Sequence, residues 1–251
     1  MLQTGHGHSE KLQKLGVHLA RTGSEVREAQ RLRYRVFAEE MGARLSCTEE
    51  GLDEDMFDPY CDHLVVTDEE TGEVLGTYRI LSGLTAKRLG GFYSDQEFDL
   101  VRLSHLRDRA VELGRSCVHP DHRSGSVIAL LWAGLAQYMR QHGYEFIIGC
   151  ASMSMVDGGH SAASAYTRLC EKYMSPAEYR VFPRCPLPLH ELDRSASPAI
   201  PPLIKAYLRV GAWVCGEPAW DPDFNTADLL MMLPLSRVDQ RYAKHFMRNA
   251  G

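Results

Sequence analysis

The stretch of sequence that decides the fold runs from Val111 to Met139, VELGRSCVHPDHRSGSVIALLWAGLAQYM. Its first part mixes β-branched and apolar residues with single polar ones and stops at the turn sequence HPD, which predicts a strand. From Ser126 onward the apolar residues recur at helical spacing, with Ser124 available as the N-cap. A strand, a polar turn and a helix in this order direct the first backbone N–H groups of the helix beyond the strand, where they can bind a phosphate or another anion.

Two charged residues predict that this strand is kinked. Glu112 and Arg115 are three positions apart, and in a regular pleat such side chains point to opposite faces. If both serve one site, the strand must carry an extra residue between them, and Gly114 is where such a bulge is easiest. A bulge also frees a backbone N–H to donate to a substrate carbonyl. This arrangement suits an acyl thioester carried on a phosphopantetheine arm.

The composition is that of an ordinary globular protein. The chain has 251 residues, of which 44% are hydrophobic and 24% charged, enough for one substantial core. The net charge of -5 argues against nucleic acid as the main partner. The seven cysteines show no CxxC pair and no spacing suited to zinc, so we expect reduced thiols and no metal. No apolar run reaches the roughly 18 residues of a membrane span, so we expect a cytoplasmic protein that at most touches the inner membrane surface.

The order of the expected elements resembles a known fold. A helix over residues 24–41, a hairpin of strands at 63–67 and 74–81, the strand-turn-helix above and a strand at 145–150 look like the GNAT N-acyltransferase fold. The resemblance implies an α/β (α+β) architecture with a mixed twisted central sheet flanked by helices. We expect the strand at 145–150 to run parallel to the central strand and to diverge from it, which would open a cleft for the thioester arm.

The loop after the central strand is where this fold holds its acyl donor. The resemblance therefore implies that the phosphopantetheine arm is bound by Val118, Arg123, Ser124, Gly125 and Ser126. The usual loop starts with Gln or Arg and continues with glycines or small residues. Here Arg123 starts it, but Ser126 and Ile128 stand at the small positions. This departure suits a donor held mainly by its protein carrier.

Spaced charged residues narrow the resemblance further. One set of residues resembles the charged signature of acyl-homoserine lactone synthases, which take acyl groups from acyl carrier protein. The set consists of Arg33 with Phe37, Asp55 with Asp58, Arg79 alone, and Glu112 with Arg115. The longer strings RYRVFAEEMGA, FDPYCDHLVV, GTYRIL, FYSDQEFDL, ELGRSCVHPDHR and IGCASM are closer to a sister family, the L-ornithine N-acyltransferases. That family makes lyso-ornithine lipid from 3-hydroxyacyl-acyl carrier protein. This second resemblance covers about residues 31–246.

The residues of the central strand suggest a mechanism without an acyl-enzyme. Glu112 is the expected general base for the attacking amine, directly or through water; the alternative is a structural ion pair with Arg115 or Arg79. Backbone N–H groups near Ser116 and Cys117 are the expected oxyanion donors. Arg79 and Arg115 would orient carboxylates, either the α-carboxylate of the substrate or aspartates of the acidic loop.

Acidic residues are expected around the acceptor. Asp55, Asp58 and Asp99 could hold its second, cationic end, as ornithine would present. Glu97 lies in the string FYSDQEFDL, whose carboxylates either face the amine or belong to a surface turn packed through its aromatic residues. The whole expected substrate-binding set is Arg33, Phe37, Asp55, Asp58, Arg79, Glu97, Asp99 and Arg115. Cys150 is expected to be a small buried thiol rather than a nucleophile, because no histidine partner can be assigned.

The remaining segments complete the expected domain. We expect a flexible tail over residues 1–23 and a single domain over residues 24–251, with a C-terminal extension from about residue 175. The helix expected after Pro202 packs in the core or lies on a lipid surface. Arginines of the first helix, and of a closing helix through Arg248, form either solvated faces or docking faces for an acidic carrier.

The expected function is transfer of a (3-hydroxy)fatty acyl group from acyl carrier protein to the α-amine of L-ornithine. No bound cofactor is expected, because acyl-acyl carrier protein is a co-substrate. One alternative is an acyl-homoserine lactone synthase with S-adenosylmethionine as acceptor, and another is an N-acyltransferase for a different amino acid. A third alternative is a protein that binds acyl carrier protein or lipid without catalysis.

Overall fold

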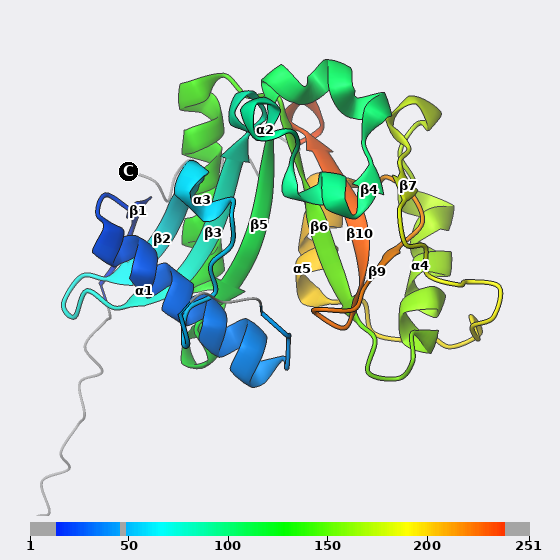
Figure 1. Cartoon of the computed structure of the whole chain (residues 1–251), viewed down its shortest axis with the longest axis horizontal. Coiled ribbons are helices and arrows are strands. Elements are labelled where there is room, and N and C mark those ends of the chain that lie inside the picture. The colour runs from blue at the N-terminus through cyan, green and yellow to red at the C-terminus, as the bar shows by residue number, and fades with distance from the viewer. Residues whose placement is uncertain (1–13, 46–48, 239–251) are drawn as a thin grey trace, which may run out of the picture.

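The computed structural model describes residues 14–45 and 49–238 of the chain. Its centre is a mixed sheet with the strand order β1-β2-β3-β5-β6-β10-β8, to which β9 adds by pairing with β10 (Figure 1). The strands of this sheet are β1 Leu15–Leu19, β2 Asp62–Asp68, β3 Val74–Ser82, β5 Ala110–Val118, β6 Phe146–Ser154, β8 Trp213–Val214, β9 Ala219–Asp221 and β10 Thr226–Pro234. A separate two-stranded sheet joins β4 Phe98–Asp99 to β7 Phe182–Pro183. The mixed α/β architecture predicted from the sequence is confirmed.

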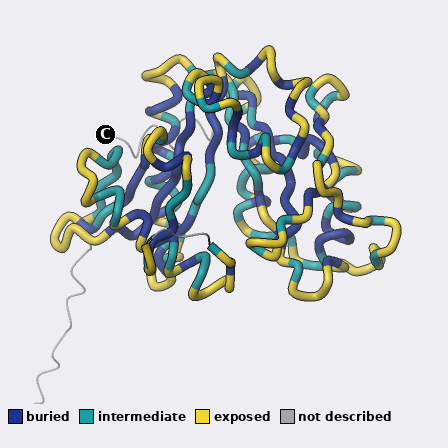
Figure 2. The backbone as a smooth tube through the Cα atoms, viewed as in Figure 1, coloured by how far each residue is buried: buried dark blue, intermediate teal, exposed yellow. Residues whose placement is uncertain are grey.

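Helices cover both faces of the sheet. They are α1 Gly23–Tyr34, α2 Gly83–Leu89, α3 Ser126–His142, α4 His160–Tyr173 and α5 Pro202–Val210, with a π-helical segment, Arg35–Glu40, directly after α1. Leu64 and Val66 of β2 pack in the same apolar cluster as α3, whereas Val65 packs with α1. Because successive side chains of a strand point to opposite faces, α1 and α3 lie on opposite sides of the sheet (Figure 1). The strands are accordingly the most buried part of the chain (Figure 2).

The kink predicted in the central strand is present in β5. The register between β3 and β5 shifts between Thr77 and Arg79, so that Thr77 lies opposite Cys117 and Arg79 opposite Gly114. The left-handed backbone conformation falls on Arg115, with φ of 50°, and not on Gly114. The bulge was predicted at Gly114 and lies one residue later, at Arg115. The side-chain contacts of Arg115 described below hold it in this conformation.

The strands β5 and β6 are parallel, and they separate after a short paired segment. Residues 110–112 pair with residues 146–148, and no further pair joins the two strands (Figure 1). At the point of separation Gly149 lies so close to β5 that a Cβ would stand 2.3 Å from the carbonyl oxygen of Leu113. Beyond Glu112, alternate N–H groups of β5 therefore face a gap instead of a neighbouring described strand. The predicted divergence of the two strands is confirmed.

Several boundaries differ from those predicted. Leu15–Leu19 form the edge strand β1, antiparallel to β2, so the domain starts before residue 24 and these residues do not belong to the expected tail. The first helix is capped by Thr22 and not by Ser24, because the Thr22 hydroxyl accepts the N–H of Glu25 at 3.2 Å. The rest of the expected tail, residues 1–13, and most of the expected basic closing helix lie outside the described residues.

The C-terminal part of the chain completes the sheet. β10 pairs with β6 along nine positions, from Thr226 opposite Ser154 to Pro234 opposite Phe146. The apolar cluster beneath it includes residues of α4, α5 and β8. None of the helices in the described part of the chain is both long enough and apolar enough to cross a bilayer.

Candidate active site

A cavity of about 640 Å³ opens where β5 and β6 separate. Its walls are residues 112–118 of β5, residues 150–152 of β6, the π-helical segment, the turn before α3, and α5. The predicted site residues that line it are Phe37, Arg79, Glu112, Arg115, Ser116, Cys117, Val118, Arg123 and Gly125. The structure therefore brings together most of the residues expected at the thioester and at the base.

Glu112 lies at the point of separation and is only 4% exposed. Its carboxylate accepts hydrogen bonds from the N–H groups of Tyr93 at 2.7 Å and Ser94 at 2.8 Å, and from the Ser94 hydroxyl. Among the described residues neither Arg79 nor Arg115 forms an ion pair with it, so the structural ion pair is not supported. Burial raises the pKa of Glu112, and the hydrogen bonds from Ser94 and Tyr93 oppose this rise. A carboxylate with a raised pKa is a stronger base near neutral pH.

A network of arginines and aspartates fixes the acidic loop before β2 against the sheet. Arg33, which is fully buried, donates from Nε to Asp53 at 2.7 Å and from Nη1 and Nη2 to Asp58 at 2.5 and 3.0 Å. Arg79 donates to Asp55 at 2.6 Å and to Asp58 at 3.3 Å. Burial alone would raise the pKa of Asp58, but the hydrogen bonds and charge of Arg33, with the charge of Arg79, hold it below its ordinary range.

Arg115 joins the same network and forms a wall of the cavity. Its Nε lies 3.1 Å from Asp53 and its Nη2 lies 3.2 Å from Asp55. The guanidinium carbon lies 5.0 Å from the ring centre of Tyr93 and 4.8 Å from that of Phe224. Arg115 thus binds aspartates of the acidic loop, which is one of the two roles predicted for it. These contacts also stabilise its left-handed backbone.

The network corrects the prediction that Asp55 and Asp58 hold the cationic end of the acceptor. Both carboxylates are already paired with arginines, and neither they nor Arg33 line the cavity. Asp53 belongs to the same network, although the sequence did not distinguish it from the other acidic residues of its loop. Phe37 does line the cavity, where its ring packs edge-on against Phe224 with centroids 6.0 Å apart.

The turn before α3 presents backbone groups to one end of the cavity. Gly125, with φ of 108°, occupies the N-cap position instead of Ser124, and no side chain caps the helix. The first N–H groups of α3 are therefore left without a side-chain acceptor, as an anion site requires. Arg123 pairs in a bidentate manner with Glu40 at 2.6 and 2.7 Å, and its Nε donates to the Val118 carbonyl at 3.2 Å. These contacts hold the turn against the π-helical segment.

The thiols at the cavity are poor nucleophiles. Burial raises the pKa of Cys117 to about 12 and that of Cys150 well above its ordinary value. Because the thiolate is the reactive form, neither cysteine is activated at neutral pH. Cys150 was predicted to be a small buried thiol rather than a nucleophile: the residue is half-buried and lines the cavity, and its raised pKa agrees with the second part of the prediction.

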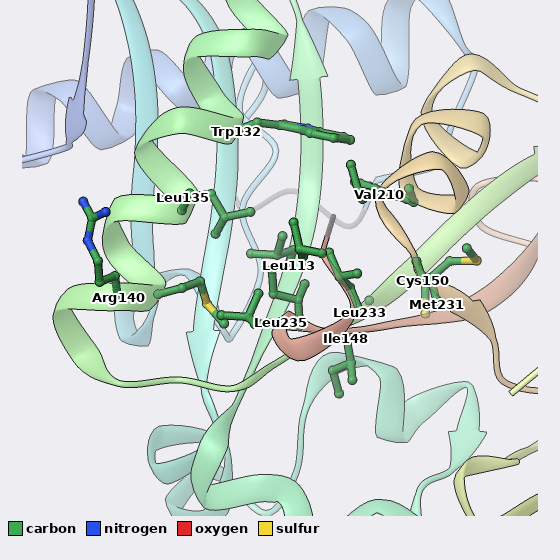
Figure 3. A pocket seen from close by; sticks show the side chains of 17 residues that line it. Leu113, Trp132, Leu135, Arg140, Ile148, Cys150, Val210, Met231, Leu233 and Leu235 are labelled. Atoms are coloured by element: carbon green, nitrogen blue, oxygen red, sulfur yellow. The ribbon is translucent and has the colours of Figure 1, made fainter. Parts of the chain in front are cut away.

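A second cavity of about 270 Å³ lies beside the first, at the split between β5 and β6 (Figure 3). Its lining is almost wholly apolar and comes from α3, β5, β6, β10 and α5, including Trp132, Leu135, Met139, Ile147, Val210, Met231 and Leu233. Leu113, Cys150 and Tyr207 line both cavities. The apolar cavity thus adjoins the 640 Å³ cavity, called the polar cavity below, where β5 and β6 separate.

The acidic residues near β4 have different surroundings. Asp99 is exposed and lines neither cavity, and its carboxylate accepts the N–H of Val101 at 2.9 Å. The prediction that Asp99 holds the acceptor is therefore corrected. The Glu97 carboxylate instead lies beside Cys150 and Asp228, with one potential ligand atom of each within 4.8 Å of the others. Asp228 is not among the site residues predicted from the sequence, although a lone carboxylate in a largely apolar strand is a signal for it.

Comparison with known proteins identifies the family. Residues 32–133 match an acetyltransferase (GNAT) domain. The chain is 39% identical to the L-ornithine N(alpha)-acyltransferase of Rhodobacter capsulatus over 246 residues, covering 92% of this chain and 94% of that protein. It is 35% identical to the protein of the same name from Brucella abortus, covering 96% of this chain and 92% of that protein.

Solved structures share the fold at low identity. The CoA-dependent acyl-homoserine lactone synthase MesI superposes with a TM-score of 0.56 at 12% identity, covering 94% of this chain and 95% of that one. FeeM, an N-acyl amino acid synthase from uncultured soil microbes, gives a TM-score of 0.56 at 12% identity, covering 90% and 93%. With these matches the chain is an acyltransferase of the GNAT fold, and it belongs to the family of L-ornithine N(alpha)-acyltransferases.

Proposed function

We propose that this protein transfers a (3-hydroxy)fatty acyl group from acyl carrier protein to the α-amine of L-ornithine, forming lyso-ornithine lipid. The observation that carries the proposal is the buried carboxylate of Glu112, which lines the polar cavity at the split between β5 and β6, where the apolar cavity adjoins it. Such a site can receive a polar amine on one side and an acyl chain on the other. The names of the relatives supply the identity of the acceptor.

The reaction needs alignment, a base and an oxyanion site. The neutral amine attacks the thioester carbonyl, the new C–N bond forms, the C–S bond breaks, and the phosphopantetheine sulfur leaves. Glu112 takes the proton from the amine, directly or through water, and its raised pKa suits that task. Backbone N–H groups near Ser116 and Cys117, on the part of β5 without a partner strand in β6, donate to the oxyanion.

The donor fits the two cavities in one orientation. Its acyl chain enters the apolar cavity beneath Trp132, and its thioester lies at the split. The phosphopantetheine arm then follows residues 118–126 toward the N-terminus of α3, whose first N–H groups bind the phosphate. Because the loop lacks most of the usual glycines, the carrier protein supplies much of the remaining binding energy.

The setting of the reaction is proposed to be the cytoplasm. The described cysteines Cys61, Cys117, Cys150, Cys170, Cys185 and Cys215 are all free thiols, as a reducing compartment favours. Contact with a membrane surface would help to release an amphiphilic product. The apolar residues of α5 do not supply such a contact, since Ile204 is buried and Leu203 and Tyr207 line the polar cavity.

One experiment tests the donor and the acceptor together. The purified protein is incubated with 3-hydroxyacyl-acyl carrier protein or the matching acyl-CoA, and with ornithine, lysine, glutamine or S-adenosylmethionine. Products are then identified by mass spectrometry. We expect Nα-acylornithine from the carrier-bound donor. Acyl-homoserine lactone, or a faster reaction with another amino acid, would refute the acceptor; equal use of acyl-CoA would refute the carrier; and no product from any amine would refute the enzymatic function.

A further inference from the structure

A pair of carboxylates without a described cationic partner lies at the polar cavity: Asp228 lines it and Glu97 lies beside Asp228. Asp228 of β10 is 4% exposed and lines the cavity, and its Oδ1 has no hydrogen-bond partner among the described residues. Both carboxylate oxygens of Glu97 are likewise buried without a hydrogen-bond partner. Within the described ranges neither side chain forms an ion pair with a lysine, arginine or histidine. This differs sharply from Asp53, Asp55 and Asp58, whose charges are all compensated.

A bound cation would relieve the cost of this arrangement. Burying a carboxylate without a hydrogen bond or a counter-charge is unfavourable, and two adjacent ones also repel each other. Accordingly, burial and the charge of its neighbour Asp228, with that of Asp221, raise the pKa of Glu97, and burial also raises the pKa of Asp228. A bound cation would remove both penalties.

The pair lies within reach of the proposed base. The Ser94 hydroxyl, which donates to Glu112, is 3.4 Å from the Cys150 sulfur, and Cys150 in turn lies beside Glu97 and Asp228. Glu112 pairs with Ile148 across the sheet, and Asp228 lies opposite Ser152. Because Ile148, Cys150 and Ser152 are alternate residues of β6, Glu112 and Asp228 lie on the same face. One molecule can therefore contact both.

Building on the proposed function, we propose that Glu97 and Asp228 bind the side-chain ammonium of the acceptor and so select a diamino acid. A primary ammonium carries three N–H donors, which match the unpartnered oxygens Glu97 Oε1, Glu97 Oε2 and Asp228 Oδ1. With the atoms of the cluster no more than 4.8 Å apart, a cation among them lies within hydrogen-bond distance of each. The three-carbon side chain of ornithine then spans toward the α-amine near Glu112.

The surroundings favour an ammonium over a metal ion. A metal would require the Cys150 thiolate as its third ligand, whereas burial raises the pKa of that thiol well above its ordinary value. An ammonium needs only the acceptor oxygens that are present. The enzyme would then select its acceptor by charge. An amino acid with an apolar side chain would leave the Glu97 and Asp228 carboxylates without a counter-charge and should react poorly.

The test compares ornithine with norvaline, which has the same carbon chain without the terminal amine. The full-length protein and its Glu97→Gln and Asp228→Asn variants are assayed for release of carrier thiol with each amine. We expect the wild type to favour ornithine about 100-fold in kcat/KM, and each variant to lose roughly 30- to 100-fold with ornithine, mainly through KM. Activity with norvaline should change less than about threefold. Asp99→Asn, an exposed carboxylate close by in sequence, should behave as the wild type.

Every other outcome is informative. Equal losses with ornithine and norvaline, or no preference in the wild type, would overturn this inference while leaving the acyltransferase function intact. No product from the wild type with either amine would overturn the proposed function and this inference with it. Stoichiometric zinc in the purified protein, with chelator-sensitive melting, would replace the ammonium by a metal. Thermal melts show that the variants fold: at pH 8 each should be at least as stable as the wild type, because it replaces a buried carboxyl group that has no counter-charge by a neutral amide.

Discussion

Replacing Arg33 by methionine should destabilise the protein by about 3 kcal/mol, because it leaves two buried aspartates short of their counter-charge. The Arg33 side chain is fully buried, and its guanidinium makes contacts of 2.5 to 3.0 Å with Asp53 and Asp58. Removing one partner of a buried ion pair typically costs about 3 to 5 kcal/mol. The lower figure applies here, because Asp53 keeps Arg115 at 3.1 Å and Asp58 keeps Arg79 at 3.3 Å.

The assay is equilibrium unfolding in urea together with a thermal melt at pH 7. For a chain of this length each kcal/mol moves the melting temperature by about 2 to 4 °C, so the expected loss is roughly 6 to 12 °C. The matched control is Arg31→Met on the same helix, because the Arg31 side chain is 50% exposed and pairs only with Glu28 among the described residues. That change should cost less than about 0.5 kcal/mol.

The pH dependence separates electrostatics from lost packing. Since Arg33 and Arg79 hold the pKa of Asp58 below its ordinary value, the network contributes stability above about pH 4 that is lost as the pH falls through the lowered pKa. In Arg33→Met the aspartates take up protons more readily, so the difference from the wild type should be largest at pH 7 and smaller at pH 4. Adding Asp58→Asn to the variant should recover part of the loss. A cost below about 1 kcal/mol, or one equal at both pH values, would refute the reasoning.

Three further predictions concern the split between β5 and β6. Glu112→Gln should lower kcat at least 100-fold, in the range of about 10² to 10⁴ for a lost general base, with a melting temperature close to that of the wild type; near-normal turnover would remove the base assignment. Gly149→Ala should lower the free energy of unfolding by roughly 1 to 3 kcal/mol, since its Cβ would lie 2.3 Å from the Leu113 carbonyl, whereas Gly114→Ala meets open space and should change it by less than about 1 kcal/mol. Leu135→Trp should shift the preferred acyl chain toward shorter donors in a competition assay, unlike Val156→Trp at an exposed site, and an unchanged profile would exclude the apolar cavity as the chain site.

The sequence predicted the fold where local patterns and burial coincide. β5, its turn and α3 follow from two clear periodicities. The spacing of Glu112 and Arg115 predicted a bulge in β5 but misplaced it, because the pairing with β3 is regular through Gly114 and the extra residue comes at Arg115 and Ser116. The edge strand β1 was missed because its five residues are all only half-buried and show no alternation. β8 and β9, of two and three residues, exist only through pairing with β10, so no local signal marks them.

The sequence also found the charged residues of the site but not their partners. It placed Asp55 and Asp58 on the acceptor, yet the structure pairs both with arginines, because a carboxylate in a loop can face either a ligand or a neighbouring chain segment. The sequence grouped Glu97 with Asp99, although the carboxylate oxygens of Glu97 are buried beside the cavity and Asp99 is solvent-exposed. The sequence shows which charged residues are present, but only the tertiary contacts determine which of their charges are neutralised by an ion pair.

The balance of charge divides the site into a structural half and a selective half. Arg33, Arg79 and Arg115 neutralise three aspartates and hold a loop, so exchanging them should first change stability. The uncompensated carboxylates of Glu97 and Asp228 are the groups that can still attract a cation. Residues 32–133 match the GNAT domain; Glu97 lies inside this range, whereas Cys150 and Asp228 lie beyond it. The apolar cavity likewise combines Leu113 and Trp132 from that part of the chain with Met231 and Leu233 of β10. From the proposed function we therefore expect substitutions at Glu97 and Asp228 to change the acceptor, and substitutions at Met231 and Leu233, on the same strand as Asp228, to change the acyl chain.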